Sequence, residues 1–443
     1  MDFTAGRAKP AIVVHYLPVV DRIFLPEPLD PLWAMLFLAA FLAAVVATVR
    51  RPSYGIFFSI CVQPFPLDHY LFNTTVTFPK VVLLGMLLGL CAQPGWRSAL
   101  REAPVRRIFV ALAAVACVVA VTIAVALHRG PAVRETFKWL EYAALFLAVC
   151  VAYRRDRNDS LLLYGWTGVT LAVSLLALLQ EGIGAPWALS MSGAIVPRIA
   201  GPLGGPNQLA AYYEIALAAL CAWYVRDRFV AGTIVVAFCA LALTFSRGGI
   251  AGAAIAIGTI FIARTSARRA LFAPVAAGAV LAAACAGFWD ALAHVPGLLP
   301  RPPSTNYAGG VGHRSELWRA AIFFWRRHPL LGIGAGNYEL ELAQAGIAGV
   351  RTHANSWYLQ ALAEGGIALF LATLALVVTT LRTLASKLNE AAPWQIAALA
   401  ASLALILHQV VDYLVFYPKV AGPWWILVAL GASSIRRSSP KPA

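Results

Sequence analysis

The chain has 443 residues, of which 60% are hydrophobic and only 12% are charged. Soluble globular domains contain about 25% charged residues, so this composition excludes an ordinary soluble enzyme and indicates an integral membrane protein. The net charge is +15, but the basic residues gather in short connectors between apolar runs, a pattern typical of cytoplasmic loops and not of a nucleic-acid-binding surface.

Paired arginines mark the predicted cytoplasmic connectors. These pairs are Arg50-Arg51, Arg106-Arg107, Arg154-Arg155, Arg268-Arg269 and Arg436-Arg437. Because a membrane-crossing helix needs about 20 apolar residues, the runs between the pairs predict an all-α integral membrane protein with about 12 to 13 transmembrane helices. We expect a single polytopic domain over residues 1–443. The seven cysteines lie in or beside apolar runs and are expected to be packing residues without a disulfide framework.

The first half of the chain contains a series of apolar runs. After a proline-broken N-terminal segment that we expect at the membrane interface, the predicted spans are about 33–49, a run from residue 54, and 78–92, 108–127, 136–153 and 161–179. The last of these leads into a predicted outer loop at 180–206, which contains Arg198.

The second half contains a long polar insert. Seven predicted helices flank it, at about 208–225, 230–245, 250–262 and 271–288 before it, and at 356–381, 394–413 and 420–430 after it. The insert, residues 289–355, is predicted to be a periplasmic loop or lid. Within it, residues 314–328 have apolar side chains at helical spacing, which predicts a short amphipathic helix on the bilayer surface.

Two arginines are candidate anion-binding residues. Counting from the basic connectors places Arg198, Arg247 and the insert on the same non-cytoplasmic side. Both arginines lie near glycines where a loop meets a helix, and a guanidinium at that depth is costly without an anionic partner. They therefore favour a bound anion such as a lipid-linked pyrophosphate. The alternative is that they extend toward lipid headgroups.

His353 is the leading candidate for proton transfer. A neutral imidazole with a reference pKa near 6.5 can accept a proton from a hydroxyl nucleophile. The alternative is a histidine that braces the entry to the next helix. His313 is the other candidate for the base. The alternative interpretation is that His313 is a solvated loop residue without a catalytic role.

His408 and Asp412 lie four residues apart and are predicted to share one helix face. A structural pair is the favoured interpretation, and orientation of the arginines is the other. No Asp-x-Asp, His-Glu-x-x-His or outer cysteine pair is present, so no metal site is indicated. The sequence also lacks a phosphate-binding loop for ATP, and no cofactor is expected.

Several motifs occur in an order that resembles the O-antigen ligase and polymerase superfamily. They are Arg198-Ile199-Ala200-Gly201-Pro202, Gly205-Pro206-Asn207-Gln208-Leu209-Ala210, Leu243-Thr244-Phe245-Ser246-Arg247-Gly248-Gly249, Arg314 through Trp318, Pro329-Leu330-Leu331-Gly332-Ile333-Gly334-Ala335-Gly336, and His353-Ala354-Asn355 leading to Glu364-Gly365-Gly366. The resemblance covers about residues 195–370. It departs from the superfamily pattern where Ala354 separates His353 from Asn355.

The resemblance implies a GT-C-like membrane glycosyltransferase of the bacterial inner membrane with a periplasmic active site. The expected reaction transfers preassembled O-polysaccharide from undecaprenyl diphosphate to a sugar hydroxyl of lipid A-core, with inversion and without a metal. His353 would be the general base, while Arg198 and Arg247 would bind the diphosphate. Further candidates for substrate contacts are His313, Arg314, Arg319, Asn207 and Asn355.

Three other functions remain open. An O-antigen polymerase and a protein O-oligosaccharyltransferase use the same kind of donor with another acceptor. A lipid or solute transporter would show repeated halves and helices broken at mid-membrane, and the sequence has no internal repeat.

Overall fold

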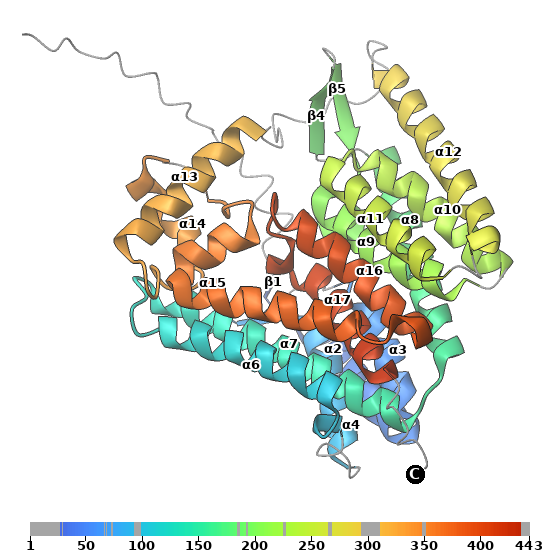
Figure 1. Ribbon diagram of the computed structural model, residues 1–443, viewed down its shortest axis with the longest axis horizontal. Helices are drawn as coiled ribbons and strands as arrows, with labels where there is room; N and C mark the ends of the chain where they lie inside the picture. Colours follow the sequence, from blue (N-terminus) through green and yellow to red (C-terminus); the bar gives the residue numbers. More distant parts are fainter. Residues whose placement is uncertain are drawn as a thin grey trace, which may run out of the picture.

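The computed structural model describes residues 27–28, 30–65, 67, 69–71, 74–92, 99–183, 187–191, 194–224, 227–264, 268–293, 311–347 and 351–435. These residues fold mainly into α-helices packed side by side (Figure 1). The helices are α2 (Pro31–Arg50), α3 (Pro52–Val62), α4 (Phe78–Cys91), α6 (Ala103–Thr122), α7 (Arg129–Arg155), α8 (Asp159–Ile183), α9 (Pro206–Trp223), α10 (Arg228–Leu243), α11 (Arg247–Ala263), α12 (Arg268–Ala293), α13 (Val311–Arg327), α14 (Tyr338–Glu341), α15 (Trp357–Leu384), α16 (Pro393–His408) and α17 (Pro418–Ser434). Short 3₁₀ helices are η1 (Gly201–Leu203), η3 (Leu342–Ala345), η4 (Leu388–Glu390) and η5 (Leu414–Phe416).

Two small sheets accompany the helices. In the first, β1 (Glu27–Pro28) pairs in parallel with β2 (His69–Leu71), which pairs antiparallel with β3 (Thr74–Val76). In the second, β4 (Trp187–Met191) pairs antiparallel with β5 (Ala194–Arg198), with Trp187 opposite Arg198. The predicted outer loop at 180–206 therefore contains a hairpin that the sequence analysis did not anticipate.

The all-α membrane character is confirmed. Among the described residues, five helices are long and apolar enough to cross a membrane: α2, α6, α7, α8 and α15. Shorter apolar helices accompany them. One of these, α3, has 11 residues, and at about 1.5 Å per residue it is too short to cross a 30 Å hydrocarbon layer by itself. The number of 12 to 13 crossings and the GT-C-like arrangement remain predictions.

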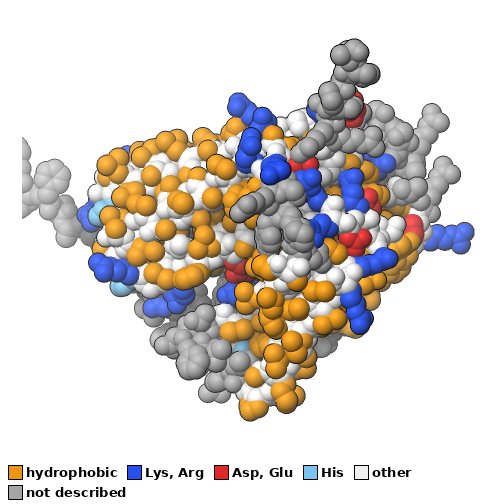
Figure 2. Space-filling view, turned by 90° about the horizontal axis from the view of Figure 1, so that it is seen from below, with side chains coloured by type: hydrophobic (Ala, Val, Ile, Leu, Met, Phe, Trp, Pro, Cys, Tyr) orange, Lys and Arg blue, Asp and Glu red, His pale blue; other side chains and the backbone are white. Residues whose placement is uncertain are grey.

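Large apolar side chains cover much of the outer surface. Val46, Leu84, Val110, Phe137 and Leu179 are all at least 47% exposed. Figure 2 shows a broad face of hydrophobic side chains, with lysines and arginines gathered in separate groups around it. Exposed apolar patches of this extent fit a lipid environment and not water.

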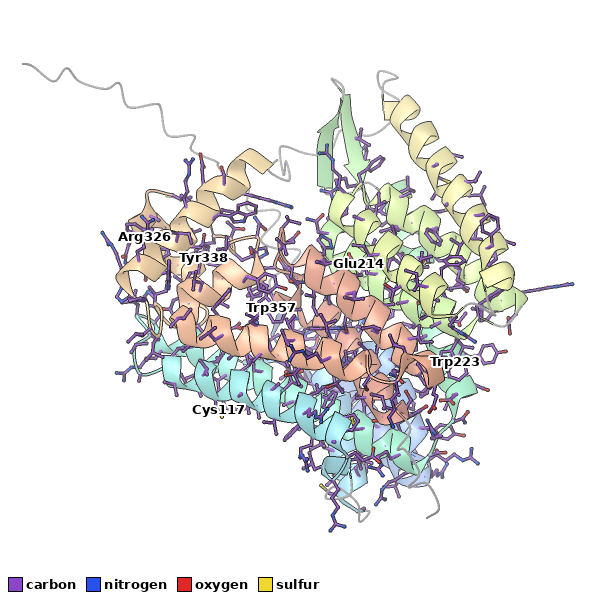
Figure 3. All side chains as sticks on the ribbon, viewed as in Figure 1. Cys117, Glu214, Trp223, Arg326, Tyr338 and Trp357 are labelled. Atoms are coloured by element: carbon purple, nitrogen blue, oxygen red, sulfur yellow. The ribbon has the colours of Figure 1, made fainter. Side chains whose placement is uncertain are left out.

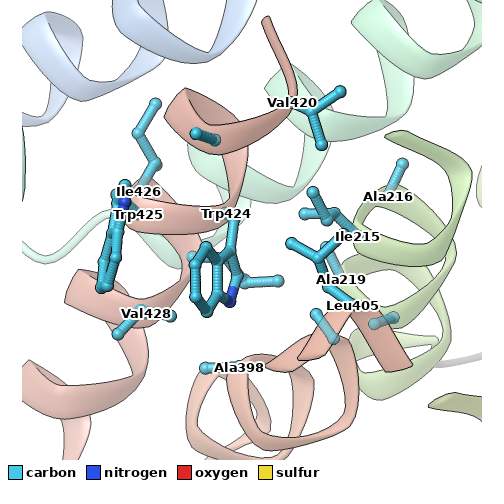
Figure 4. Close-up of a cluster of buried hydrophobic side chains, with 14 of the residues drawn as sticks. Ile215, Ala216, Ala219, Ala398, Leu405, Val420, Trp424, Trp425, Ile426 and Val428 are labelled. Carbon is cyan, nitrogen blue, oxygen red and sulfur yellow. The ribbon is translucent and has the colours of Figure 1, made fainter. Parts of the chain in front are cut away.

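Helices α9 and α17 form the centre of the bundle. Their side chains are buried on all sides, as expected for helices that are apolar around their whole circumference. Trp424 of α17 lies beside Ala398 of α16 and near Ala219 of α9 (Figure 4). The small alanines leave room for the indole, whose Nε1 donates to Ser402 Oγ at 3.0 Å. This packing fixes α9, α16 and α17 relative to one another.

Helix α15 is interrupted at Gly366, which has φ +59° and ψ −157°. The segment 329–334 fills the interruption. Ile333 N donates to Ala363 O (3.1 Å), Gly334 N to Glu364 O (2.9 Å) and Ile367 N to Pro329 O (2.9 Å). Two of the sequence motifs, 329–336 and 364–366, are therefore partners in one backbone joint, which satisfies polar groups that the broken helix leaves free.

The insert predicted at 289–355 differs from expectation in two ways. Helix α12 continues through Ala293, so the insert begins later. The amphipathic helix is confirmed as α13, but its apolar face packs on protein: Leu317, Ala321 and Phe324 join one buried cluster with Tyr338 and others. The expected placement of this face on the bilayer surface is therefore wrong. Residues 294–310 and 348–350 lie outside the described part.

Contacts between helix termini define two groups of termini, which lie at opposite ends of the bundle. The arginine end joins the starts of α3, α6, α8 and α16 to the end of α7. Its contacts are Glu102–Arg154 (2.9 Å), Ser53–Asp156 (2.6 Å) and Asp159–Trp394 (2.9 Å). Since Arg50, Arg51, Arg106 and Arg107 are next to these termini, this is the basic end of the bundle.

The hairpin end joins the other termini. Its contacts are Gln180 Oε1 with Gly201 N (2.7 Å), Ile199 N with Leu243 O (3.2 Å), Thr122 Oγ1 with Ala335 N (3.1 Å) and Asp412 O with Trp357 N (3.2 Å). The residues singled out by sequence, from Arg198 to His353, belong to this end.

Candidate functional site

Arg198 is fixed in a buried position at the end of β5. Only 4% of the residue is exposed. Its Nε donates to Thr244 O at 2.6 Å and its Nη2 donates to Asn207 Oδ1 at 3.0 Å. Burial lowers the pKa of the guanidinium to about 10, and the carboxylate of Asp412 opposes this shift. Arg198 therefore stays charged at neutral pH in a fixed orientation.

Asp412 is the counter-charge of this region. Its Oδ2 accepts a hydrogen bond from Asn207 Nδ2 at 2.8 Å and lies 3.7 Å from Arg314 Nη2. Its Oδ1 accepts from the backbone N–H of Tyr413 at 2.8 Å. Asp412 thus connects Arg198, through Asn207, with Arg314 on α13. We call Arg198, Asn207, Asp412 and Arg314 the arginine–aspartate cluster.

The predicted pairing of His408 with Asp412 is wrong. Helix α16 ends at His408, so Asp412 lies in the following turn and no longer shares its helix face. The imidazole of His408 instead contacts Glu214 of α9, with Nδ1 2.5 Å from Oε1. Glu214 lies among the helices on the right of Figure 3.

The glycines after Arg247 make room for this buried pair. A Cβ on Gly248 would overlap His408 Nε2, and one on Gly252 would overlap the carboxyl group of Glu214. The glycines of the Ser246-Arg247-Gly248-Gly249 motif therefore serve close helix packing, which brings the start of α11 next to α9 and α16.

His353 lies in an aromatic cage, and only 7% of the residue is exposed. Its ring contacts Tyr413, Phe416 and Tyr417, with ring centroids 5.7–5.9 Å apart. Nε2 lies 3.1 Å from the Tyr417 hydroxyl, while Nδ1 accepts the backbone N–H of Asn355 at 3.2 Å. Because Nδ1 is an acceptor, the proton of the neutral ring is on Nε2, which donates to Tyr417.

The electrostatic surroundings favour the neutral imidazole. Burial lowers the pKa of His353 below its usual value, Asp412 opposes this shift and Arg314 adds to it. The ring is therefore uncharged at neutral pH and has one basic lone pair, at Nδ1. A neutral histidine beside fixed cations can accept a proton from a hydroxyl group.

The loop that carries His353 is anchored on both sides. Asn355 adopts a left-handed backbone conformation, with φ +48°, and its carbonyl accepts from Trp318 Nε1 at 3.4 Å. Ala354 N donates to Gln360 Oε1 at 2.7 Å. The Ser356 side chain caps α15, whose first residue, Trp357, lies near the centre of Figure 3. These contacts hold the imidazole next to the arginine–aspartate cluster.

The remaining candidates are less closely connected. Arg247 is exposed as the first residue of α11, and Arg319 is exposed on α13. Among the described residues, no hydrogen bond or ion pair joins either side chain to the arginine–aspartate cluster. His313 belongs to α13, but its side chain is outside the described side chains.

Tyr417 was not identified from the sequence. The Gln208 side chain also hydrogen-bonds its hydroxyl group, and burial raises its pKa, so it stays a neutral phenol. The only available signal was the aromatic run Tyr413-Leu414-Val415-Phe416-Tyr417 between two apolar helices. Such a run is usually interpreted as interfacial anchoring, which conceals its contact with His353.

The arrangement can bind an anion beside a base. Arg198 and Arg314 carry two positive charges, of which Asp412 balances one, so a negatively charged group would complete the charge balance. In the described part of the chain, no group of three His, Cys, Asp or Glu side chains could hold a metal ion. The site thus combines fixed guanidinium groups with an uncharged histidine.

The comparisons with known proteins give one family match, which covers part of the site. Residues 232–374, from α10 to the middle of α15, match the model of the O-antigen ligase family. The match includes Arg247, Arg314 and His353, whereas Arg198 and Asp412 lie outside it. A search of curated proteins finds no match. Over this part of the sequence, the chain is similar to the O-antigen ligase family.

Proposed function

We propose that the protein is an O-antigen ligase of the bacterial inner membrane. It would transfer a preassembled O-polysaccharide from undecaprenyl diphosphate to a sugar hydroxyl of lipid A-core on the periplasmic face. The observation that carries the proposal is the arginine–aspartate cluster beside a neutral His353, in a chain that is similar to the O-antigen ligase family. The arginines of the cluster can bind a diphosphate, and a neutral histidine can accept the proton of a hydroxyl group.

In the proposed reaction, the acceptor oxygen attacks the anomeric carbon of the donor. The new carbon–oxygen bond forms as the bond to the diphosphate breaks, and attack opposite the leaving group inverts the anomeric centre. The hydroxyl proton passes to Nδ1 of His353, where the acceptor replaces the Asn355 N–H. Arg198 stabilises the charge on the departing diphosphate, and Arg314 and Arg247 assist it.

Tyr417 has a positioning role in this scheme. By accepting a hydrogen bond from Nε2–H, it holds the imidazole in the tautomer that leaves Nδ1 basic. Asp412 likewise orients Arg198 through Asn207 before the donor binds. The remaining candidates, Arg319, His313 and Asn355, would contact the substrates.

The test is a reconstituted reaction with purified protein, undecaprenyl-diphosphate-linked glycan and two alternative acceptors. We expect glycan on lipid A-core and none on a second lipid-linked glycan. His353→Ala should lower the rate about 100-fold to 10,000-fold, because general-base catalysis contributes about that much. The exposed His328 provides a matched control, and His328→Ala should keep wild-type activity.

Two outcomes would contradict the proposal. Extension of the lipid-linked glycan without transfer to lipid A-core would identify a polymerase. Transfer by His353→Ala at the wild-type rate would remove the base from its assigned role. Arg198→Gln should in addition weaken donor use, measured as an increase in the donor KM.

A further inference from the structure

A cavity lies at the arginine end, away from the candidate site. It has a volume of about 470 Å³ and lies between the start of α6 and the end of α15. Arg106, Arg107 and Arg382 line it together with Thr379 and the apolar wall of α6. All three arginines are exposed, and none of the ion pairs among the described residues involves them.

The cavity and His353 are at opposite ends of one helix pair. Helix α6 has 20 residues and is therefore about 30 Å long, close to the thickness of a hydrocarbon layer. Arg106 is in its first turn, whereas Thr122 at its other end contacts the 329–336 segment. Helix α15 starts beside His353 and has Arg382 in its last turn. A ligand here is therefore at the other membrane surface from the candidate site.

The lining of the cavity changes along α6. Three guanidinium groups lie where α6 starts and α15 ends. Val110 and Ala114 follow on the same face of α6, one and two turns further into the bundle. Val110 is 58% exposed, so this wall faces the surroundings. A free inorganic ion would use only the arginines, whereas a molecule with a phosphate headgroup and an acyl chain would use the whole surface.

We propose that this cavity binds an anionic phospholipid of the cytoplasmic leaflet. The phosphate group lies among Arg106, Arg107 and Arg382, and an acyl chain lies along Val110 and Ala114. Basic pockets between membrane helices on the cytoplasmic side recognise such headgroups by charge. The bound lipid links α6 to α15 and thereby stabilises the helix pair that carries His353 at its other end.

The experiment measures the thermal unfolding midpoint of the full-length protein in neutral detergent. Phosphatidylglycerol is titrated, and phosphatidylcholine or inorganic phosphate is added in parallel. We expect phosphatidylglycerol to raise the midpoint by several degrees and the other two additions to have no effect. Arg107→Gln/Arg382→Gln should weaken the apparent affinity by about tenfold or more, since each basic residue near an anionic lipid contributes appreciably.

Two further variants decide between the explanations. Arg50→Gln/Arg51→Gln removes the same charge from the same end of the bundle outside the cavity, and it should respond like the wild type. Ala114→Trp keeps every arginine but fills the apolar wall, and it should also lose the lipid response. The proposal would be overturned if phosphatidylglycerol raised the midpoint equally in all variants. It would also be overturned if phosphatidylcholine or inorganic phosphate raised the midpoint as much as phosphatidylglycerol does. Native mass spectrometry of the same samples should show retained phosphatidylglycerol only where the midpoint rises.

Discussion

At the scale of single residues, the hydrogen bonds of His353 determine what the imidazole can do. Nε2 donates to Tyr417, so the basic nitrogen is Nδ1, which accepts the backbone N–H of Asn355 at 3.2 Å. A substrate hydroxyl that donates to Nδ1 would replace this hydrogen bond of the imidazole, and the Asn355 N–H would then need another acceptor. The reactive nitrogen is thereby defined by the neighbouring residue and not by the histidine alone.

The pH dependence of the reaction follows from the same surroundings. A general base works in its neutral form, and burial lowers the pKa of His353 below its usual 6.5. The rate should therefore rise with pH and reach half its maximum below pH 6.5. Asp412 raises this pKa, so Asp412→Asn should move the half-maximum to still lower pH. The measurement is kcat against pH in the reconstituted reaction.

Asp227→Asn is the control for this prediction. Asp227 caps α10 and accepts from Phe229 N and Val230 N, which an asparagine also can do. Asp227 also accepts from Tyr164 near the start of α8, at the arginine end, so the substitution removes the same charge at the end of the bundle opposite His353. The assigned effect of Asp412 on His353 would be wrong if the pH of half-maximal kcat did not change in Asp412→Asn. It would also be wrong if that pH changed equally in Asp227→Asn.

Arg198 and His353 were predicted from the sequence because polar residues in apolar surroundings are conspicuous, while Arg314 and Asn207 were added with the family resemblance. For Asp412, the favoured prediction of a structural pair with His408 was wrong, whereas the alternative, orientation of the arginines, agrees with its contacts. That role depends on the end of α16 at His408, where Trp357 N binds the carbonyls of Gln409 and Asp412 instead of leaving them to a longer helix. Such a termination is a tertiary contact, which helical periodicity does not report.

At the scale of elements, the broken helix α15 explains two glycine-rich motifs at once. Apolar periodicity predicts α15 as continuous, because the interruption lies within an apolar run. Gly366 and Gly332 both have positive φ angles, and each approaches the backbone of the other segment so closely that a Cβ would overlap it. The spacing of the glycines indicated a tight backbone. Only the folded chain shows that each glycine packs against the backbone of the other segment.

Substitution at this joint should be costly. Gly366→Ala places a Cβ against the Leu330 backbone in a conformation that only glycine adopts readily, which costs about 1–3 kcal/mol before any overlap is relieved. We expect a clearly lower thermal unfolding midpoint in detergent. Gly232 lies in α10 with no atom near its missing Cβ, so Gly232→Ala should leave the midpoint unchanged or raise it slightly.

The comparison of these two variants is decisive for the joint. Equal midpoints would show that the 329–334 segment does not pack on α15 as described. Because the joint connects the segment after α13 to α15 two turns after its start beside His353, a loosened joint should also reduce transfer activity. Gly232→Ala should not affect activity.

At the scale of the whole molecule, the charge pattern and the contacts group the same helix termini at one end of the bundle. The arginine pairs predicted one cytoplasmic side, and the contacts among Glu102, Arg154, Asp156 and Asp159 place those termini together. The hairpin end carries the candidate site. Apolar runs and basic connectors were sufficient for this level of organisation, because burial in lipid determines it. The small sheets were not predictable, since β4 and β5 follow from pairing within a short loop.

The orientation predicts which positions can be labelled from outside the cell. Arg326 is exposed on α13 (Figure 3), and the segment that follows this helix contacts Thr122 at the hairpin end. Glu390 is exposed in η4 after α15 at the arginine end. In a chain whose native cysteines are replaced by alanine, Arg326→Cys should react with a membrane-impermeant maleimide in intact spheroplasts. Glu390→Cys should react only after the membrane is permeabilised. The reverse pattern would place His353 and the arginine–aspartate cluster in the cytoplasm, where a periplasmic ligase cannot work.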